Sequence, residues 1–316
     1  MRLTVATLII ALAGVIASAQ TPTLRIVPDG PNLPADLYYG NIKVKPLRLR
    51  PGTNTVVTIN DADFFVSQQY FDFLSRVPDA SGQTFWTNEI TGCGANAACV
   101  ELKRISVSGA FFLSIEFKET GYLVYRFHKA AFGDQFGDAT GAKVPIRREN
   151  FIPDSRSISS GVIVGQTGWE GVLETNKQAF ALAFVQRPEF QAAFPANMSA
   201  AAFVDQLDTN AGFVLSSSDK ATLVGVLGAT PSDPAKRASV VRSIAENANL
   251  QQNEFNKAFV LMQYFGYLKR NPNDAPDTNF AGYNFWLAKL NQFGGNFINA
   301  EMVKAFIAST EYNQRF

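Results

Sequence analysis

The sequence has few of the side chains that most enzymes use. It contains one histidine and two cysteines among 316 residues, and only 17% of its residues are charged. One histidine is too few for a histidine-based zinc site, and two cysteines are too few for a cysteine-rich one. No glycine-rich phosphate loop follows a predicted strand, since Gly161 and Gly165 lack the lysine of such a loop. We therefore expect no catalytic residues, no enzymatic activity and no cofactor, apart from the calcium candidate considered below.

Excess charge of either sign is also missing. The sequence has 28 Lys and Arg against 27 Asp and Glu. A nearly neutral chain without basic runs has no electrostatic footprint for nucleic acid or for anionic lipid. We expect a protein or a cell-surface polymer as the partner, and no nucleic acid.

After the first twenty residues, no apolar run is as long as the roughly 20 residues that span a bilayer. At the start, Met1 and Arg2 precede an apolar stretch over residues 3–17, and Ala17-Ser18-Ala19 follows as a small-x-small cleavage site. This pattern is typical of a secretory signal peptide, and an uncleaved anchor is the alternative. We predict a signal peptide over residues 1–19, cleaved near Ala19-Gln20. The mature chain would have no transmembrane segment and would be extracellular, periplasmic or on the cell surface.

Cys93 and Cys99 lie six positions apart in a Gly-rich segment. Export favours a disulfide between them that closes a small loop. A metal pair is the alternative, but the sequence offers it no further Cys or His ligands nearby.

Phenylalanine is abundant, at 27 copies, and the aromatic residues recur in a fixed order. Residues 65–90 and 259–290 share the same succession of Phe-Val, Gln-Tyr, Arg-x-Pro, Gly and Phe-Trp. The residues that we expect to form a repeated core are Phe65, Tyr70 and Trp86 in one segment, Phe259, Tyr264 and Trp286 in the other, and Trp169 between them. Such internal similarity at one spacing is the sequence signature of repeated structural units.

We predict four units at about 64–117, 121–190, 203–255 and 259–312, the middle two being more divergent. In each unit the apolar residues follow helical three-to-four spacing, which predicts helix, turn, helix and helix. The predicted fold is therefore all-α, with the units packed into one helical domain over residues 61–316. Residues 134–168 interrupt the pattern as an insertion, and the Pro-rich segment 20–60 predicts an extended, β-like N-terminal arm.

These motifs, together with the closing Ser-x-Glu-Phe of Ser114 to Phe117, resemble those of domain-of-unknown-function family 4214. The resemblance covers about residues 64–316, and it is closest to the secreted, acidobacterial type, which has a similar cysteine loop. It implies export and a helical fold but supplies no chemistry. The repeat is also similar, more weakly, to the helical domain of phycobilisome linker proteins, which are scaffolds.

The polar residues that could form a site can each be explained by an ordinary structural role. His128 is predicted to lie on a helix as a satisfied or exposed side chain, Asp72 on a helix surface and Asp79 in a turn. Glu116 recurs as Glu189, Glu254 and Glu311, which favours a packing or hydrogen-bonding role. Asn273, Asp274, Asp277 and Asn279 are a candidate calcium loop, although the same residue types are ordinary in turns.

Three functions follow from the sequence. The first is a non-catalytic structural or interaction protein of the bacterial cell exterior. The alternatives are a carbohydrate- or calcium-dependent binding module, with the tryptophans lining a sugar-binding face, and a hydrolase that uses His128 or scattered carboxylates.

Overall fold

The computed structural model describes residues 24–28, 35–44 and 48–316. The predicted signal peptide over residues 1–19 lies outside the described residues. The chain divides into two compact units, one up to Leu47 and the other from Arg48 to Phe316. No helix in the described part of the chain is both long and apolar enough to cross a membrane.

In the first unit, the described residues form a small antiparallel sheet. Strands β1 (Leu24–Pro28), β2 (Ala35–Tyr39) and β3 (Ile42–Val44) follow one another in the order β1-β2-β3. Tyr39 pairs with Ile42 across a two-residue turn. Gly40 has a φ of +60° in this turn, a conformation that tight hairpins require and that glycine adopts readily.

Residues 48–60 do not belong with this sheet, although we predicted one arm over residues 20–60. They form a hairpin around Pro51-Gly52, in which the amide of Val57 donates to the carbonyl of Arg48 at 2.7 Å. The guanidinium of Arg50 binds the Asp63 carboxylate at 2.6 Å and the Asp61 carboxylate at 3.2 Å. These ion pairs join the hairpin to the first helix, so the helical unit begins at Arg48.

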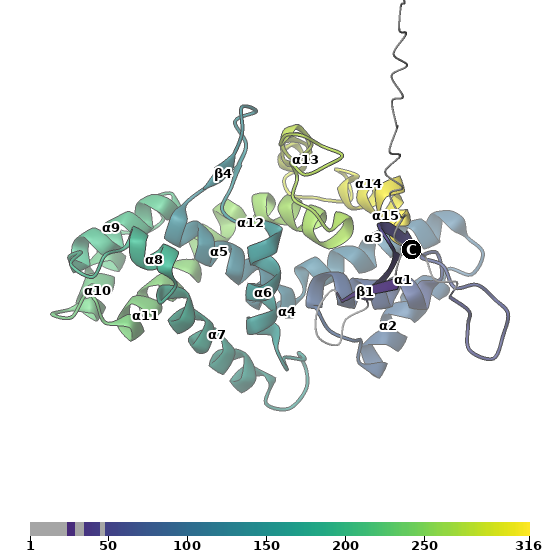
Figure 1. Ribbon diagram of the computed structural model, residues 1–316, viewed down its shortest axis with the longest axis horizontal. Helices are drawn as coiled ribbons and strands as arrows, with labels where there is room; N and C mark the ends of the chain where they lie inside the picture. The colour runs from purple at the N-terminus through teal and green to yellow at the C-terminus, as the bar shows by residue number, and fades with distance from the viewer. Residues whose placement is uncertain (1–23, 29–34, 45–47) are drawn as a thin grey trace, which may run out of the picture. The chain divides into compact units, whose positions relative to one another are not determined.

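The second unit is mostly helical, as predicted (Figure 1). Its first part contains α1 (Ala62–Gln69), the π-helical turn η1 (Tyr70–Leu74), α2 (Ala80–Thr91), α3 (Ala97–Leu113), α4 (Ile115–Glu119) and α5 (Gly121–Phe132). The middle part contains α6 (Arg148–Ser159), α7 (Trp169–Val185), α8 (Pro188–Ala193), α9 (Ala200–Ala211), α10 (Ser217–Leu227) and α11 (Pro234–Ala245). The last part contains α12 (Ala248–Gln263), the π-helical turn η2 (Tyr264–Leu268), α13 (Ala281–Gln292), α14 (Met302–Ala308) and α15 (Thr310–Asn313).

Side-chain caps explain where several helices begin. The carboxylate of Asp79 accepts from the amide of Gly82 at 2.7 Å, and the hydroxyl of Ser199 accepts from the amide of Ala202 at 3.2 Å. Each cap satisfies an amide that has no partner within the helix. Asp61 precedes α1 without such a bond, because its carboxylate binds the amide of Thr58 and Arg50 instead.

The segment 134–168, which we predicted as an insertion, has secondary structure of its own. It contains the two-stranded hairpin β4 (Phe136–Gly137) and β5 (Lys143–Val144), and then helix α6. Helix α6 packs on α5 and α7, so this segment is part of the helical unit.

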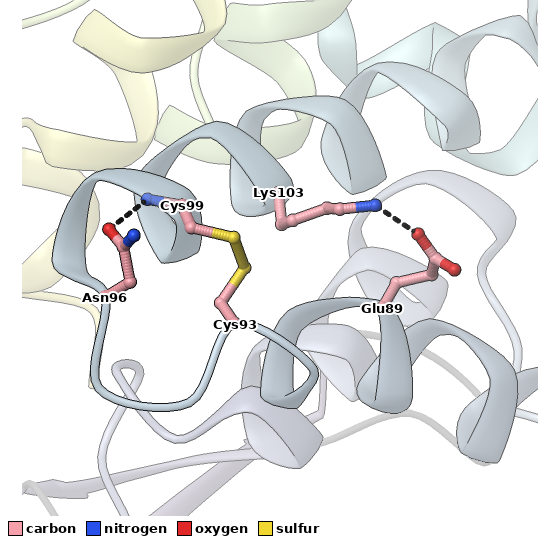
Figure 2. The surroundings of a disulfide bond; sticks show 5 residues. All are labelled: Glu89, Cys93, Asn96, Cys99 and Lys103. Atoms are coloured by element: carbon pink, nitrogen blue, oxygen red, sulfur yellow. Dashed lines mark hydrogen bonds and ion pairs between the residues drawn. A yellow bond between two sulfur atoms is a disulfide. The ribbon is translucent and has the colours of Figure 1, made fainter.

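The cysteine pair lies at disulfide distance, between α2 and α3 (Figure 2). Cys93 and Cys99 are bonded with their Cα atoms 5.6 Å apart. Asn96 caps α3 by accepting from the amide of Cys99, and Lys103 pairs with Glu89 at 2.6 Å. These contacts hold the end of α2 against the start of α3.

The two ends of the helical unit meet. Helix α3 packs on α14, and η1 packs on η2, so the blue helix α3 and the yellow helix α14 lie side by side in Figure 1. The rings of Phe73 and Tyr267 contact each other edge to face at 4.9 Å, and Tyr267 donates to Gln69 at 2.9 Å. A Cβ at Gly266 would lie 2.0 Å from the Phe73 ring, so this close approach requires glycine.

Candidate functional site: two matching aromatic clusters

Two regions of the helical unit contain the same set of contacts. In both, an α-helix widens into a π-helical turn, η1 or η2, and ends at a residue in the left-handed conformation. These residues are Ser75, with φ +54°, and Lys269, with φ +57°. Neither is glycine, so both positions hold a conformation that costs free energy in a non-glycine residue. The next residue in each case is an arginine.

These two arginines bind equivalent partners. The Nε atom of Arg76 donates to Glu116 at 2.7 Å, and Nε of Arg270 donates to Glu311 at 2.6 Å. A second guanidinium nitrogen of each arginine binds the other oxygen of the same glutamate, which makes both pairs bidentate. The pair of Arg76 and Glu116 connects two segments 40 residues apart.

A second carboxylate and a tyrosine complete each set. Arg76 also contacts Asp79 at 3.4 Å and lies 4.9 Å from the ring centre of Tyr70. Arg270 likewise contacts Asp277 at 2.9 Å and lies 5.3 Å from the ring centre of Tyr264. Burial, together with the nearby Asp79 charge, raises the pKa of Tyr70 to about 12, so its hydroxyl is protonated at neutral pH.

The aromatic contacts match as closely. Tyr70 meets Phe111 edge to face at 4.7 Å, and Tyr264 meets Phe306 edge to face at 5.2 Å. Trp86 lies 5.9 Å from Phe111, and Trp286 lies 5.8 Å from Phe306. The surroundings of Trp86 and Trp286 are therefore alike.

Each cluster ends in an exposed phenylalanine. Phe85 packs edge to face on Trp86 at 4.8 Å, and Phe285 packs in the same way on Trp286 at 4.9 Å. Phe85 is 56% exposed and Phe285 is 59% exposed. We call Phe85–Trp86 and Phe285–Trp286 the two aromatic pairs. In the first cluster the pair borders a cleft of about 450 Å³, which Ile115 and the Arg76–Glu116 ion pair also line.

The middle of the chain does not contain a third copy of this cluster among the described residues. Trp169 is the first residue of α7 and is half-buried, whereas Trp86 and Trp286 lie in the middle of α2 and α13. The predicted boundary between residues 255 and 259 also falls inside α12, which runs without a break. The common position that we assigned to all three tryptophans therefore fits only two of them.

His128 is buried and held by an acid. Its Nε2 atom lies 2.8 Å from the Asp154 carboxylate, which also receives two hydrogen bonds from Arg187 at 2.6 and 2.9 Å. Burial lowers the pKa of His128 even though the hydrogen bond to Asp154 raises it. The ring packs against Phe184 at 5.1 Å. This is the satisfied helical histidine that we expected, with its acid already shared with an arginine.

The acidic residues do not gather into one site. Asp72, predicted on a helix surface, is buried and binds both Arg315 and Lys269. Glu254 is also buried and accepts from Tyr125, whereas Glu189 is exposed. The four recurring glutamates therefore share a role only at Glu116 and Glu311.

The candidate calcium loop uses its carboxylates internally. Asp274 binds Arg147 at 3.0 Å, and Asp277 binds Arg270 at 2.9 Å. The side-chain oxygen of Asn279 accepts from the amide of Ala281. Asn273 is the remaining candidate, and its buried oxygen has no partner among the described residues. The part of the chain that the structure describes brings no three Asp, Glu, His or Cys side chains together as metal ligands.

A comparison of the chain with protein-family models, with curated proteins and with solved structures finds no match in any of the three. The family resemblance seen in the sequence therefore stays a prediction. The arginine networks of the two clusters were not predicted from the sequence. The signal was nevertheless there, because Arg76 and Arg270 occupy the same place in the repeated motif.

Proposed function

We propose that this chain is an exported, non-catalytic interaction protein of the bacterial cell exterior. In this proposal it is built from four related helical units, as in family 4214, and binds a protein or a surface polymer through its two aromatic pairs. Export rests on the predicted signal peptide. The disulfide is compatible with an oxidising compartment.

The observation that carries the proposal is the matched exposure of Phe85 and Phe285. A buried residue that recurs in two units is explained by packing, as for Tyr70 and Tyr264. A single exposed phenylalanine also needs no explanation. An exposed phenylalanine ring on the equivalent tryptophan of both clusters does need an explanation, because the exposed side of each ring contributes nothing to packing within the chain. A repeated contact with a partner accounts for it, since aromatic side chains dominate binding energy at interfaces.

The surroundings of His128 support the non-catalytic part of the proposal. A general base must reach the proton that it removes. His128 is buried, its Nε2 atom faces Asp154, and its ring packs among Phe132 and Phe184. The hydrolase alternative is therefore the least supported of the three, and the calcium version of the binding-module alternative receives no support from the loop at Asp274.

Cosedimentation with isolated bacterial cell walls tests the proposal. The mature chain, residues 20–316, is mixed with walls, and the retained fraction is measured before and after the walls are treated with protease. Loss of retention after protease indicates a protein partner, and unchanged retention indicates a polymer. The double variant Phe85→Ala/Phe285→Ala should be retained at least about 10-fold less, because truncating a hot-spot side chain at an interface costs about 2 kcal/mol or more.

The matched control is Phe213→Ala. Phe213 is 72% exposed and lies outside both clusters, so this variant removes an exposed phenylalanine ring without touching either aromatic pair. Its retention should equal that of the wild type. The proposal is wrong if the wild-type chain is not retained, or if the double variant is retained as well as the control.

A further inference from the structure

A second and separate cleft, of about 760 Å³, lies between α5, α12 and α13. This volume is in the range of small-molecule sites, about 300–1,000 Å³. The cleft is lined by Lys118, Tyr122, Tyr125 and Arg126 on one side and by residues 251–258 of α12 and Leu287 and Asn291 of α13 on the other. Neither aromatic pair belongs to this lining.

Tyr122 is one of the lining residues, and its hydroxyl is unpaired. The residue is only 3% exposed, and the buried hydroxyl has no hydrogen-bond partner in the described structure. Burial raises the pKa of Tyr122 well above its usual value, so the hydroxyl stays protonated and able to donate. The ring stacks on Phe255 of α12 at 5.5 Å. A buried polar group without a partner is costly, which is why such groups in native proteins require an explanation.

The charged residues of the cleft are already neutralised within the protein. Glu254 accepts from Tyr125 at 2.8 Å and from Lys257 at 2.7 Å. Arg126 donates to the carbonyl of Ala245 at 2.6 Å, and Glu119 and Glu246, which both bind Lys177, lie near its charge. Lys118 is the exposed charge of this lining. A probe that carries negative charge therefore has to be compared with neutral ones.

Carboxamide side chains supply the remaining polar surface. Gln251, Gln252, Asn253 and Asn256 follow one another along α12, and Asn291 lies across from them on α13. The side chain of Asn256 donates to that of Asn291 at 2.8 Å. Gln252 and Asn253 are exposed, and their side chains form no hydrogen bond within the described residues. A carboxamide both donates and accepts, which is the pairing that a hydroxyl group needs.

We infer that this cleft is a binding site for a neutral, hydroxyl-rich ligand, a saccharide, which pairs with the carboxamides of Gln252 and Asn253 and with the Tyr122 hydroxyl. The site goes beyond the proposed function, since it uses different residues from the aromatic pairs. A saccharide fits because each sugar hydroxyl donates and accepts, and because its ring carbons can contact Phe255 and Leu287. Specificity then comes from groups that would otherwise be left unpaired.

Titration calorimetry with defined oligosaccharides tests the inference on the mature chain. The neutral probes are hexamers of cellulose, maltose-type glucan and chitin, and an oligogalacturonate of the same length tests the contribution of charge. At least one neutral probe should bind, and more tightly than the acidic one. Gln252→Ala/Asn253→Ala should weaken that binding by about 10-fold or more, because each hydrogen bond contributes about 1 kcal/mol.

Tyr122→Phe separates a role in binding from a role in stability, because it should change the affinity for the ligand without lowering the melting temperature. Removing an unpaired buried hydroxyl leaves no group unsatisfied in the free protein, so the melting temperature should be unchanged or higher. Affinity for the neutral probe should nevertheless fall by about 5-fold or more, since one hydrogen bond to the ligand is lost.

The control for both variants is Phe213→Ala, which removes an exposed ring outside the cleft and should bind the oligosaccharide as well as the wild type does. The two proposals fail separately, because the cleft variants keep both aromatic pairs and Phe85→Ala/Phe285→Ala keeps every residue of the cleft. The inference is overturned if none of the neutral probes binds, if the acidic probe binds more tightly, or if the cleft variants retain wild-type affinity.

Discussion

Replacing Asp72 by asparagine tests how the two ends of the helical unit are joined. The Asp72 side chain is 1% exposed and belongs to η1, near the start of the unit. Its carboxylate receives hydrogen bonds from Arg315 at 2.7 and 2.9 Å and pairs with Lys269 at 2.9 Å. Asparagine keeps the size of the side chain and removes its charge, which leaves two cations facing a neutral group.

The expected loss follows from burial and from the number of partners. Breaking a buried ion pair by removing one partner typically costs about 3–5 kcal/mol, because the remaining charge stays desolvated. The helical unit has 269 residues, from 48 to 316. With an unfolding entropy of roughly 2 cal/mol/K per residue, a loss of about 4 kcal/mol corresponds to a melting temperature lower by about 7 °C.

The pH dependence of this effect has a definite sign. Burial alone would raise the pKa of Asp72, but the charges of Arg315 and Lys269 and their hydrogen bonds outweigh it and lower the pKa. A lowered pKa contributes stability that is complete above the unfolded value of about 3.9 and is lost as the pH falls through the folded value. The difference between wild type and variant should therefore be constant above about pH 4 and should shrink below it.

Urea denaturation followed by circular dichroism measures the change. The control is Asp205→Asn, which removes an aspartate that is 63% exposed and paired with Lys220. An exposed pair contributes about 0–1 kcal/mol, so this variant should shift the midpoint little. The reasoning fails if Asp72→Asn and Asp205→Asn lower the midpoint equally.

Two further predictions concern the other buried ion pairs. Glu116→Gln should lower the free energy of unfolding by about 3 kcal/mol, and Glu311→Gln should lower it by about 1 kcal/mol. The two bidentate pairs are otherwise equivalent, but the Glu116 side chain is 4% exposed and the Glu311 side chain 32% exposed. Equal urea midpoints for the two variants would contradict this ranking. Burial lowers the pKa of His128, so protonation favours the unfolded chain and the wild type should lose stability as the pH falls from about 6.5 to 5. His128→Gln should make this loss smaller, because glutamine does not titrate. Urea midpoints at pH 5.0 and 7.5 measure this slope, and the same slope in both proteins would refute it.

Local signals in the sequence predicted much of the helical unit. Ser199 and the proline at position 234 mark helix starts that the structure contains. At α11 the cap is Asp233, because its carboxylate accepts from the amides of Ala235 and Lys236. Such signals depend on a few neighbouring residues, which is why the sequence alone indicates them.

Features that depend on distant residues were not predictable in this way. Nothing in the types of residue marks the point at Tyr70 where the α-helix becomes the π-helical turn η1. This turn packs against η2, which is nearly 200 residues away in the sequence. The burial of Asp72 likewise depends on Arg315, 243 positions along the chain. The cleft between α5, α12 and α13 also requires knowing which helices are neighbours, which the spacing of apolar residues does not specify.

The contact between η1 and η2 has a topological consequence. Phe316 packs on Phe64 at 5.6 Å, and Arg315 reaches Asp72, so the helical unit forms a closed circuit rather than an open stack. This arrangement differs from a solenoid, in which each repeat contacts only its neighbours. We expect that a circular permutant would keep every contact of both aromatic clusters. Its linker would join residue 316 to residue 48, and its new ends would lie in the exposed turn between α10 and α11.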